Sequence, residues 1–232
     1  MDLVRVLPQL HMFRFRVGQA YLWSDGAGLT LIDAGPPGAA REIAEGVRSL
    51  GLDPARIGRI VLTHCHEDHF GGALELAREY GARVLAHRLD APVVRGEQRV
   101  AEPVLLDWEI PLRAEAVRGL TPASPTPVDQ ELEDGDELDF GDGARVVHTP
   151  GHTPGGCGFH LARHGVLFTG DCVAGTGGVR LGVFNIDREQ TKASMRRLAV
   201  LAPSTVCFGH GDPVTEDATV ALLTAAVRDA EL

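Results

Sequence analysis

The sequence predicts an α/β protein, because short apolar segments of β type alternate with amphipathic helical segments along most of the chain. Apolar residues make up 44% and charged residues 23% of the 232 residues, which is typical of a globular protein with a sizeable core. No low-complexity stretch or linker interrupts the alternation. We therefore expect residues 1–232 to form a single domain, with an irregular insertion or lid at about 91–128.

The N-terminal half is expected to begin with strands and then to alternate strands with helices. A helix is predicted at 38–51, because Ile43, Val47 and Leu50 have helical spacing and Gly51 can end the helix. The other elements expected in this half are strands at 4–17, 20–23, 29–35 and 57–64, a helix at 70–81 and a strand at 82–87.

Residues 91–128 interrupt this alternation. The segment contains six prolines, which predict irregular structure, with one helix near 107–119. Irregular segments of this length are often binding loops or lids. The elements expected after it are a hairpin at 137–152 with a Gly-Asp-Gly turn, a strand at 165–171, a helix at 187–202, a strand at 204–211 and a helix at 215–232.

Charge and hydropathy exclude several classes of function. The formal net charge of −10 argues against a general nucleic-acid binder, whose affinity rests on cationic contacts to phosphates. No segment approaches the roughly 20 consecutive apolar residues of a membrane span, and the first residues lack the apolar core of a signal peptide. We expect a cytoplasmic protein with reduced cysteines that acts on a small molecule, without nucleic-acid or membrane partners, and that could form a homodimer.

The segment from His64 to His69 is the strongest indication of chemistry. It places three imidazoles and the Asp68 carboxylate within six residues, directly after an apolar strand and before a helix. Sites of α/β proteins lie at this carboxyl end of their strands, and imidazole with carboxylate suits zinc and similar divalent ions. The alternative is a polar loop in which Asp68 caps the next helix, but four ligand-type residues at this spacing disfavour it.

Three later segments repeat the pattern of an apolar strand followed by a ligand-type residue beside glycine. They contribute His152 in TPGHT, Asp171 in TGD and His210 in GHG. Together with the segment from His64 to His69, they supply enough ligands for two ions of coordination number four to five.

This order of motifs resembles the metallo-β-lactamase superfamily, with HxHxDH at His64, His66, Asp68 and His69. The resemblance implies a four-layer αββα sandwich that holds two Zn²⁺ ions, with Fe or Mn possible. The implied ligands are His64, His66 and His152 for one ion, Asp68, His69 and His210 for the other, and Asp171 as a bridge between both.

The resemblance also implies hydrolysis of a small ester, lactone or thioester by a metal-bridging hydroxide. Asp68 and Asp171 would be the catalytic carboxylates, with Asp68 orienting the nucleophile. One alternative is a mononuclear iron persulfide dioxygenase that uses only His64, His152 and Asp171. Others are a metallo-phosphodiesterase, a β-lactamase-like hydrolase, or a member without activity, which the full ligand set disfavours.

Several residues beside these motifs have two interpretations. Asp33 either accepts a hydrogen bond from a ligand imidazole or simply belongs to a turn, and the sequence does not decide. His148 is expected to be structural, and His87 to face solvent or a loop. Phe184 and Asn185 are candidates to line the substrate pocket.

Overall fold

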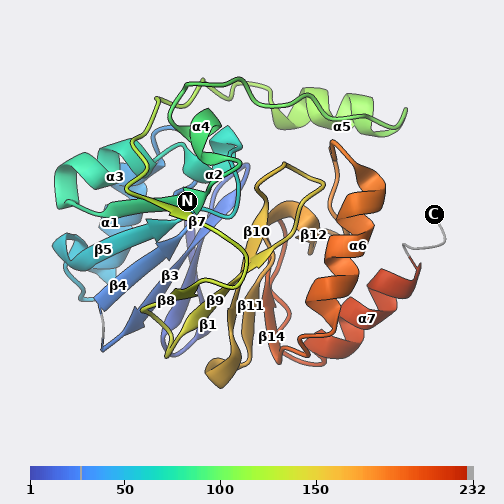
Figure 1. The fold of residues 1–232 in the computed structure, drawn as a ribbon. Coiled ribbons are helices and arrows are strands. Elements are labelled where there is room, and N and C mark those ends of the chain that lie inside the picture. Colours follow the sequence, from blue (N-terminus) through green and yellow to red (C-terminus); the bar gives the residue numbers. More distant parts are fainter. Residues whose placement is uncertain (27, 229–232) are drawn as a thin grey trace. The chain divides into compact units, whose positions relative to one another are not determined.

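The computed structural model of the chain describes residues 1–26 and 28–228. Residue contacts divide the chain into two compact units. The first unit comprises Met1–Val100 and Gly119–Leu132, and the second comprises Ala101–Arg118 and Glu133–Leu232. Each unit has a β-sheet and helices of its own (Figure 1), so the predicted α/β class is confirmed.

The sheet of the first unit changes from antiparallel to parallel pairing at β4. Its strands lie in sequence order, with antiparallel pairing as far as β4 and parallel pairing from β4 to β7. They are β1 (Asp2–Leu7), β2 (Leu10–Arg14), β3 (Gln19–Asp25), β4 (Gly28–Ile32), β5 (Ile57–Val61), β6 (Arg83–His87) and β7 (Gln130–Leu132). Parallel neighbours require crossover connections, and the alternation of helices and strands after β4 provides them.

Helices of the first unit share one buried hydrophobic cluster with the strands of this sheet. In α1 (Ala39–Ser49) the buried face includes Ile43 and Val47, both fully inaccessible, as the helical spacing predicts. After the 3₁₀ turn η1 (Pro54–Arg56) and β5, the chain forms α2 (Glu67–Phe70) and α3 (Ala73–Tyr80). The carboxyl ends of β4 and β5 therefore lie side by side, which brings the segments after Ile32 and Val61 together.

Residues 91–128, all of which the structure describes, contain two short helices and no strand. Helix α4 (Ala91–Val94) belongs to the first unit, and α5 (Glu109–Ala116) to the second. The helix expected near 107–119 is thus present in a shorter form. Whether the segment acts as a lid remains a prediction.

The second unit has a sheet in the order β14-β11-β10-β9-β8, in which β11 and β14 are parallel and the other neighbours antiparallel. The strands are β8 (Glu137–Leu138), β9 (Ala144–His148), β10 (Cys157–Leu161), β11 (Val166–Phe168) and β14 (Thr205–Cys207). The 3₁₀ turns η2 (Ala162–His164) and η3 (Gly170–Cys172) precede and follow β11, and β12 (Val173–Ala174) pairs with β13 (Arg180–Leu181).

Two helices, α6 (Arg188–Ala199) and α7 (Ala218–Arg228), complete the core of the second unit. Met195 and Leu198 of α6 and Leu222 of α7 are fully buried in one cluster with residues of the sheet. Helix α7 begins three residues later than expected, and residues 229–232 of the expected helix lie outside the described part of the chain.

The strand β10 and the short strand β7 were not expected from the sequence. In β10 the polar His160 and the glycine Gly158 break the apolar pattern of Cys157–Leu161. In β7 two of three residues, Gln130 and Glu131, are polar. Pairing with β9 and β11 and with β6, respectively, makes these segments strands, so neither carries a local signal.

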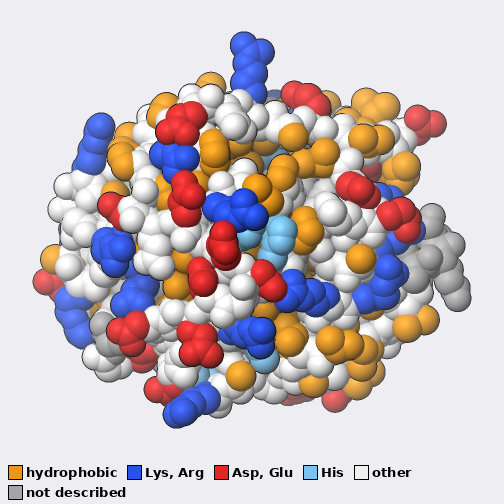
Figure 2. Space-filling view, in the orientation of Figure 1, with side chains coloured by type: hydrophobic (Ala, Val, Ile, Leu, Met, Phe, Trp, Pro, Cys, Tyr) orange, Lys and Arg blue, Asp and Glu red, His pale blue; other side chains and the backbone are white. Residues whose placement is uncertain are grey.

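None of the described helices combines the length and apolar character needed to cross a lipid bilayer. On the face that Figure 2 shows, acidic and basic side chains are interspersed. The absence of nucleic-acid and membrane partners remains a prediction.

Candidate metal centre

The HxHxDH segment lies where the first unit passes from β5 into α2. His64 and His69 are almost completely buried, with 3% and 0% of their surface exposed. The His69 carbonyl accepts a hydrogen bond of 2.6 Å from the Ala34 amide, which joins this loop to the segment after β4. Gly18 has a φ of +70°, and a β-carbon there would collide with the Asp68 carbonyl, so the turn before β3 can approach the loop only with glycine.

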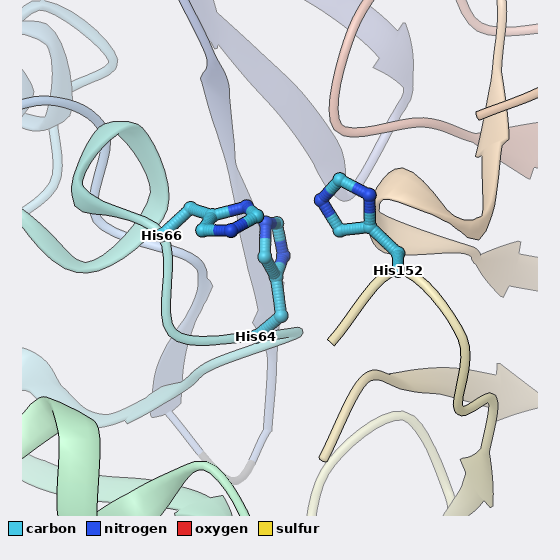
Figure 3. Close-up of side chains that lie close together, drawn as sticks. All are labelled: His64, His66 and His152. Atoms are coloured by element: carbon cyan, nitrogen blue, oxygen red, sulfur yellow. The ribbon is translucent and has the colours of Figure 1, made fainter. Parts of the chain in front are cut away.

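The imidazoles of this segment gather closely. The ring centroids of His64 and His66 are 4.8 Å apart with the rings nearly perpendicular, and those of His64 and His69 are 4.2 Å apart (Figure 3 shows His64 and His66). The Asp68 Oδ2 atom lies 3.5 Å from His69 Nε2. The first unit thus brings all four predicted ligands of the HxHxDH segment to one place.

Asp33 orients two of these imidazoles, which decides between the two interpretations that the sequence left open. Its Oδ2 atom accepts a hydrogen bond of 2.9 Å from His69 Nδ1, because an ionised carboxylate can only accept. The Thr63 hydroxyl donates to the same oxygen at 2.8 Å and lies 3.0 Å from His64 Nδ1. Since the hydroxyl proton is already used, His64 Nδ1 must be the donor, which leaves Nε2 of both imidazoles as the lone-pair nitrogen.

Asp90, which the sequence analysis did not single out, supports the same loop. It follows β6, is 1% exposed, and its Oδ2 accepts a hydrogen bond of 3.0 Å from the Cys65 amide. Its position could have indicated this role, because Asp90 is an acidic residue soon after β6, the parallel neighbour of β5.

A second group of predicted ligands lies in the second unit. Asp171 Oδ2 is 3.6 Å from His152 Nε2 and 3.2 Å from His210 Nε2, so both imidazoles address one carboxylate oxygen. His152 projects from the loop between β9 and β10 (Figure 3). Asp171 lies in η3 and His210 follows β14, so that parallel neighbours β11 and β14 deliver both.

The segment from Gly182 to Asp187 fixes His152 from two sides. Its Val183 carbonyl accepts a hydrogen bond of 3.0 Å from His152 Nδ1. The Ile186 and Asp187 amides both donate to the Gly151 carbonyl at 2.9 Å. Gly151 itself has a φ of +126° and lies so close to Thr191 that a β-carbon would collide with it.

The chemistry of both groups fits a bound cation. When Nδ1 of His69 and His152 donates its proton, the neutral ring presents a lone pair at Nε2. That lone pair faces a carboxylate oxygen at 3.5 Å in one case and 3.6 Å in the other. Two acceptors facing each other repel unless a cation lies between or beside them, and imidazole with carboxylate suits zinc, iron or manganese.

Two further histidines and the four cysteines are not among the predicted ligands. His148 Nε2 bonds to the Pro154 carbonyl at 2.9 Å, as expected for a structural residue. The expectation that His87 faces solvent or a loop is wrong as to solvent, because His87 is 3% exposed. All four cysteines are buried thiols that form no disulfide. Burial raises the pKa of the Cys65, Cys172 and Cys207 thiols, so these three are poor nucleophiles.

Asn185, a candidate to line the substrate pocket, holds the backbone around it, and its role in the pocket remains a prediction. It is 2% exposed, its Nδ2 donates to the Gly182 carbonyl at 2.7 Å, and its Oδ1 accepts from the Thr191 hydroxyl at 3.0 Å. Its amide thus holds the segment after β13 in shape. The side chain of its neighbour Phe184 is partly exposed, and its role in the pocket remains a prediction.

A family model described as the metallo-β-lactamase superfamily matches residues 14–210. This range includes every predicted metal ligand, and it covers most of the chain. The chain therefore belongs to the metallo-β-lactamase superfamily, and it is a metal-dependent hydrolase with the metallo-β-lactamase fold. The predicted family, fold class and enzyme class are confirmed, while the assignment of individual ligands remains a prediction.

Among proteins to which the chain is similar, the uncharacterized protein YobT of Bacillus subtilis is 30% identical over 203 residues, 82% of either chain. A hydroxyacylglutathione hydrolase of Gloeobacter violaceus is 34% identical over 171 residues, 73% of this chain. The match spans only 54% of that enzyme and 48% of the one from Cereibacter sphaeroides, about half the length of these relatives.

Among solved structures, TTHA1623 in a di-iron-bound form is 29% identical with a TM-score of 0.66, and the match covers 93% of this chain and 94% of that one. The subclass B3 metallo-β-lactamase MEM-A1 has a TM-score of 0.74 at 22% identity, over 100% of this chain and 95% of that one. The second likeness shows the fold alone.

Proposed function

We propose that the chain is a binuclear zinc-dependent hydrolase of small thioesters, with esters and lactones as related substrates. The observation that carries this proposal is the similarity, at 33–34% identity, to enzymes called hydroxyacylglutathione hydrolases, because a hydroxyacylglutathione is a thioester. Since the chain spans about half of their length, the proposal concerns the bond that is cleaved and not glutathione as the carrier.

In the proposed site, the predicted ligands would hold two ions. His64, His66 and His152 would bind one ion, Asp68, His69 and His210 the other, and Asp171 both. Bound divalent ions of this kind lower the pKa of water toward neutrality and polarise a substrate carbonyl oxygen. Zinc is favoured by the neutral imidazoles and carboxylates, while the di-iron form of TTHA1623 makes iron the leading alternative.

The protein's own residues then supply orientation and proton handling. Asp33 and Thr63 fix the rings of His69 and His64. The Asp68 side chain remains 13% exposed, so its carboxylate can orient an attacking water molecule and accept its proton. Asp33 has only 4% of its side chain exposed, so it orients the imidazoles and takes no part in proton transfer.

The test is metal analysis of the purified protein, followed by assays with a thioester, an ester, a lactone, a β-lactam and a phosphodiester. We expect about two zinc ions per chain and the highest kcat/KM for the thioester. His152→Ala and Asp171→Asn should lower kcat by at least about a hundredfold and reduce bound metal. The matched control is His148→Ala, which removes a histidine four residues from His152 whose Nε2 bonds to the Pro154 carbonyl. This variant should keep metal and activity.

Other results would replace the proposal. One iron per chain together with oxygen uptake on a persulfide would establish the dioxygenase alternative. Preferred cleavage of a β-lactam or a phosphodiester would reassign the substrate within the same family. Full activity of His152→Ala would refute the assignment of this ligand.

A further inference from the structure

Glu109 is a buried acid in a helix that is otherwise exposed. It is 1% exposed and is the buried residue of α5. Its neighbours Trp108, Ile110 and Leu112 are 51%, 54% and 45% exposed. The helix is therefore not anchored by an apolar face, as helices usually are, but by a carboxylate, which is costly to bury without compensating partners.

The partners of Glu109 lie in the segment that fixes His152. Its Oε1 atom accepts a hydrogen bond of 3.3 Å from the Phe184 amide, 75 residues away in the chain, and lies 3.6 Å from Arg188 Nη1. Its Oε2 atom accepts from the Leu106 amide at 2.9 Å, within its own turn. If Glu109 only stabilised the start of its own helix, the Oε2 contact would be sufficient, and the side chain would not need to be buried.

A second contact joins the same two segments. The Val104 amide donates to the Asn185 carbonyl at 2.9 Å. Phe184, between Val183 and Asn185, has a φ of +59°, a left-handed conformation that is unfavourable for a side chain of this kind. Such backbone persists only where surrounding contacts hold it, and Glu109 supplies one of them directly at the Phe184 amide.

We propose that Glu109 is a positioning residue for His152, acting through the segment from Gly182 to Asp187. Glu109 holds the Phe184 amide, and the neighbouring Val183 carbonyl holds His152 Nδ1. Ile186 and Asp187 hold the carbonyl of Gly151, the residue before His152. The irregular segment around α5 thus determines how the His152 imidazole is presented. This inference rests on the proposed function only in taking His152 as a metal ligand.

The test compares Glu109→Ala, Glu109→Gln and the control Glu102→Ala in the full-length chain. Glu102 is an acid of the same segment, 77% exposed at its side chain and paired with Arg113. In Glu109→Ala we expect the Ile186 and Asp187 amides to exchange hydrogen about tenfold faster, and zinc affinity, measured by competition with a chelator, to weaken about tenfold. Glu109→Gln keeps one acceptor oxygen and should give a smaller change in both, whereas Glu102→Ala should stay within about twofold of wild type.

The NMR signal of the His152 Nδ1–H group, measured without metal, separates the inference from the proposed function. The inference requires this signal to broaden or exchange faster in the Glu109 variants. If wild type binds no zinc, the proposed function fails while this measurement still tests the positioning role. If Glu109→Ala does not fold, as judged by circular dichroism, Glu109→Gln carries the test. Unchanged amide exchange and an unchanged His152 signal in a folded Glu109 variant would overturn the inference, as would an equal effect of Glu102→Ala.

Discussion

The Asp33 carboxylate illustrates how a residue outside the predicted ligand set can orient predicted ligands. It accepts hydrogen bonds from His69 Nδ1, from the Thr63 hydroxyl and, through its other oxygen, from the Thr63 amide at 2.7 Å. These bonds fix the proton on Nδ1 of His69 and, through Thr63, of His64. The Nε2 atoms are then available to a metal ion. Asp33 itself has a φ of +60°, which an aspartate tolerates better than most residues.

We expect Asp33→Asn to weaken zinc binding by about ten- to a hundredfold, because the amide presents a mixture of donor and acceptor atoms to His69 and Thr63. Competition with a chelator measures this directly. The control is Asp25→Asn. The Asp25 carboxylate accepts a hydrogen bond from Trp23 Nε1 near the end of β3, and its replacement should leave zinc affinity unchanged. Equal affinities of wild type and Asp33→Asn would show that the carboxylate does not orient the ligands.

At the scale of elements, hydrogen bonds tie the start of helix α6 to the loop that carries His152. Asp187 is the N-cap of α6, and its Oδ1 accepts a hydrogen bond of 2.9 Å from the Gln190 amide. Its own amide donates to Gly151. The start of the helix and the loop that carries His152 are therefore fixed by the same residue.

Replacement of this cap gives a prediction about stability. Asp187→Ala should lower the free energy of unfolding by about 1 kcal/mol, the usual cost of losing an N-cap side chain. Asp187→Asn keeps a capping oxygen and should stay close to wild type. Urea denaturation of the three proteins measures the difference, and equal loss in both variants would assign the effect to charge instead of capping.

At the scale of the whole molecule, the predicted ligands are divided between the two units. His64, His66, Asp68 and His69 belong to the first unit, and His152, Asp171 and His210 to the second. Ions that bind the folded chain and not the unfolded chain shift the folding equilibrium toward the folded state.

We expect zinc to raise the melting temperature of the metal-free protein. At a free concentration of a hundred times Kd, each bound ion stabilises the folded state by about 2.7 kcal/mol. For a chain of this length, that corresponds to an increase of roughly 5–10 °C. Thermal unfolding after treatment with a chelator, with zinc and with magnesium as the control ion, measures the shift. The proposed zinc site would be untenable if zinc and magnesium had the same effect.

Local patterns were sufficient to predict the α/β class, most helices and several strands. The helix spacing of Ile43 and Val47 and the burial of their side chains agree, because an amphipathic face has a period that the sequence displays. The strand β10 and the burial of His87 and Asn185 were not predicted, because each depends on neighbours contributed by other parts of the chain.

The sequence by itself determined which ligand-type residues are present, their order along the chain and hence the family. Only the tertiary structure decided which partners hold the predicted ligands and the segment beside them: Asp33 with His69 across 36 residues, Val183 with His152 across 31, and Glu109 with Phe184 across 75. The physical reason is that motifs and periodicities are local, whereas a hydrogen bond depends on the distance between two atoms after folding. A hydrogen bond between residues far apart in the chain therefore produces no recognisable pattern in the sequence.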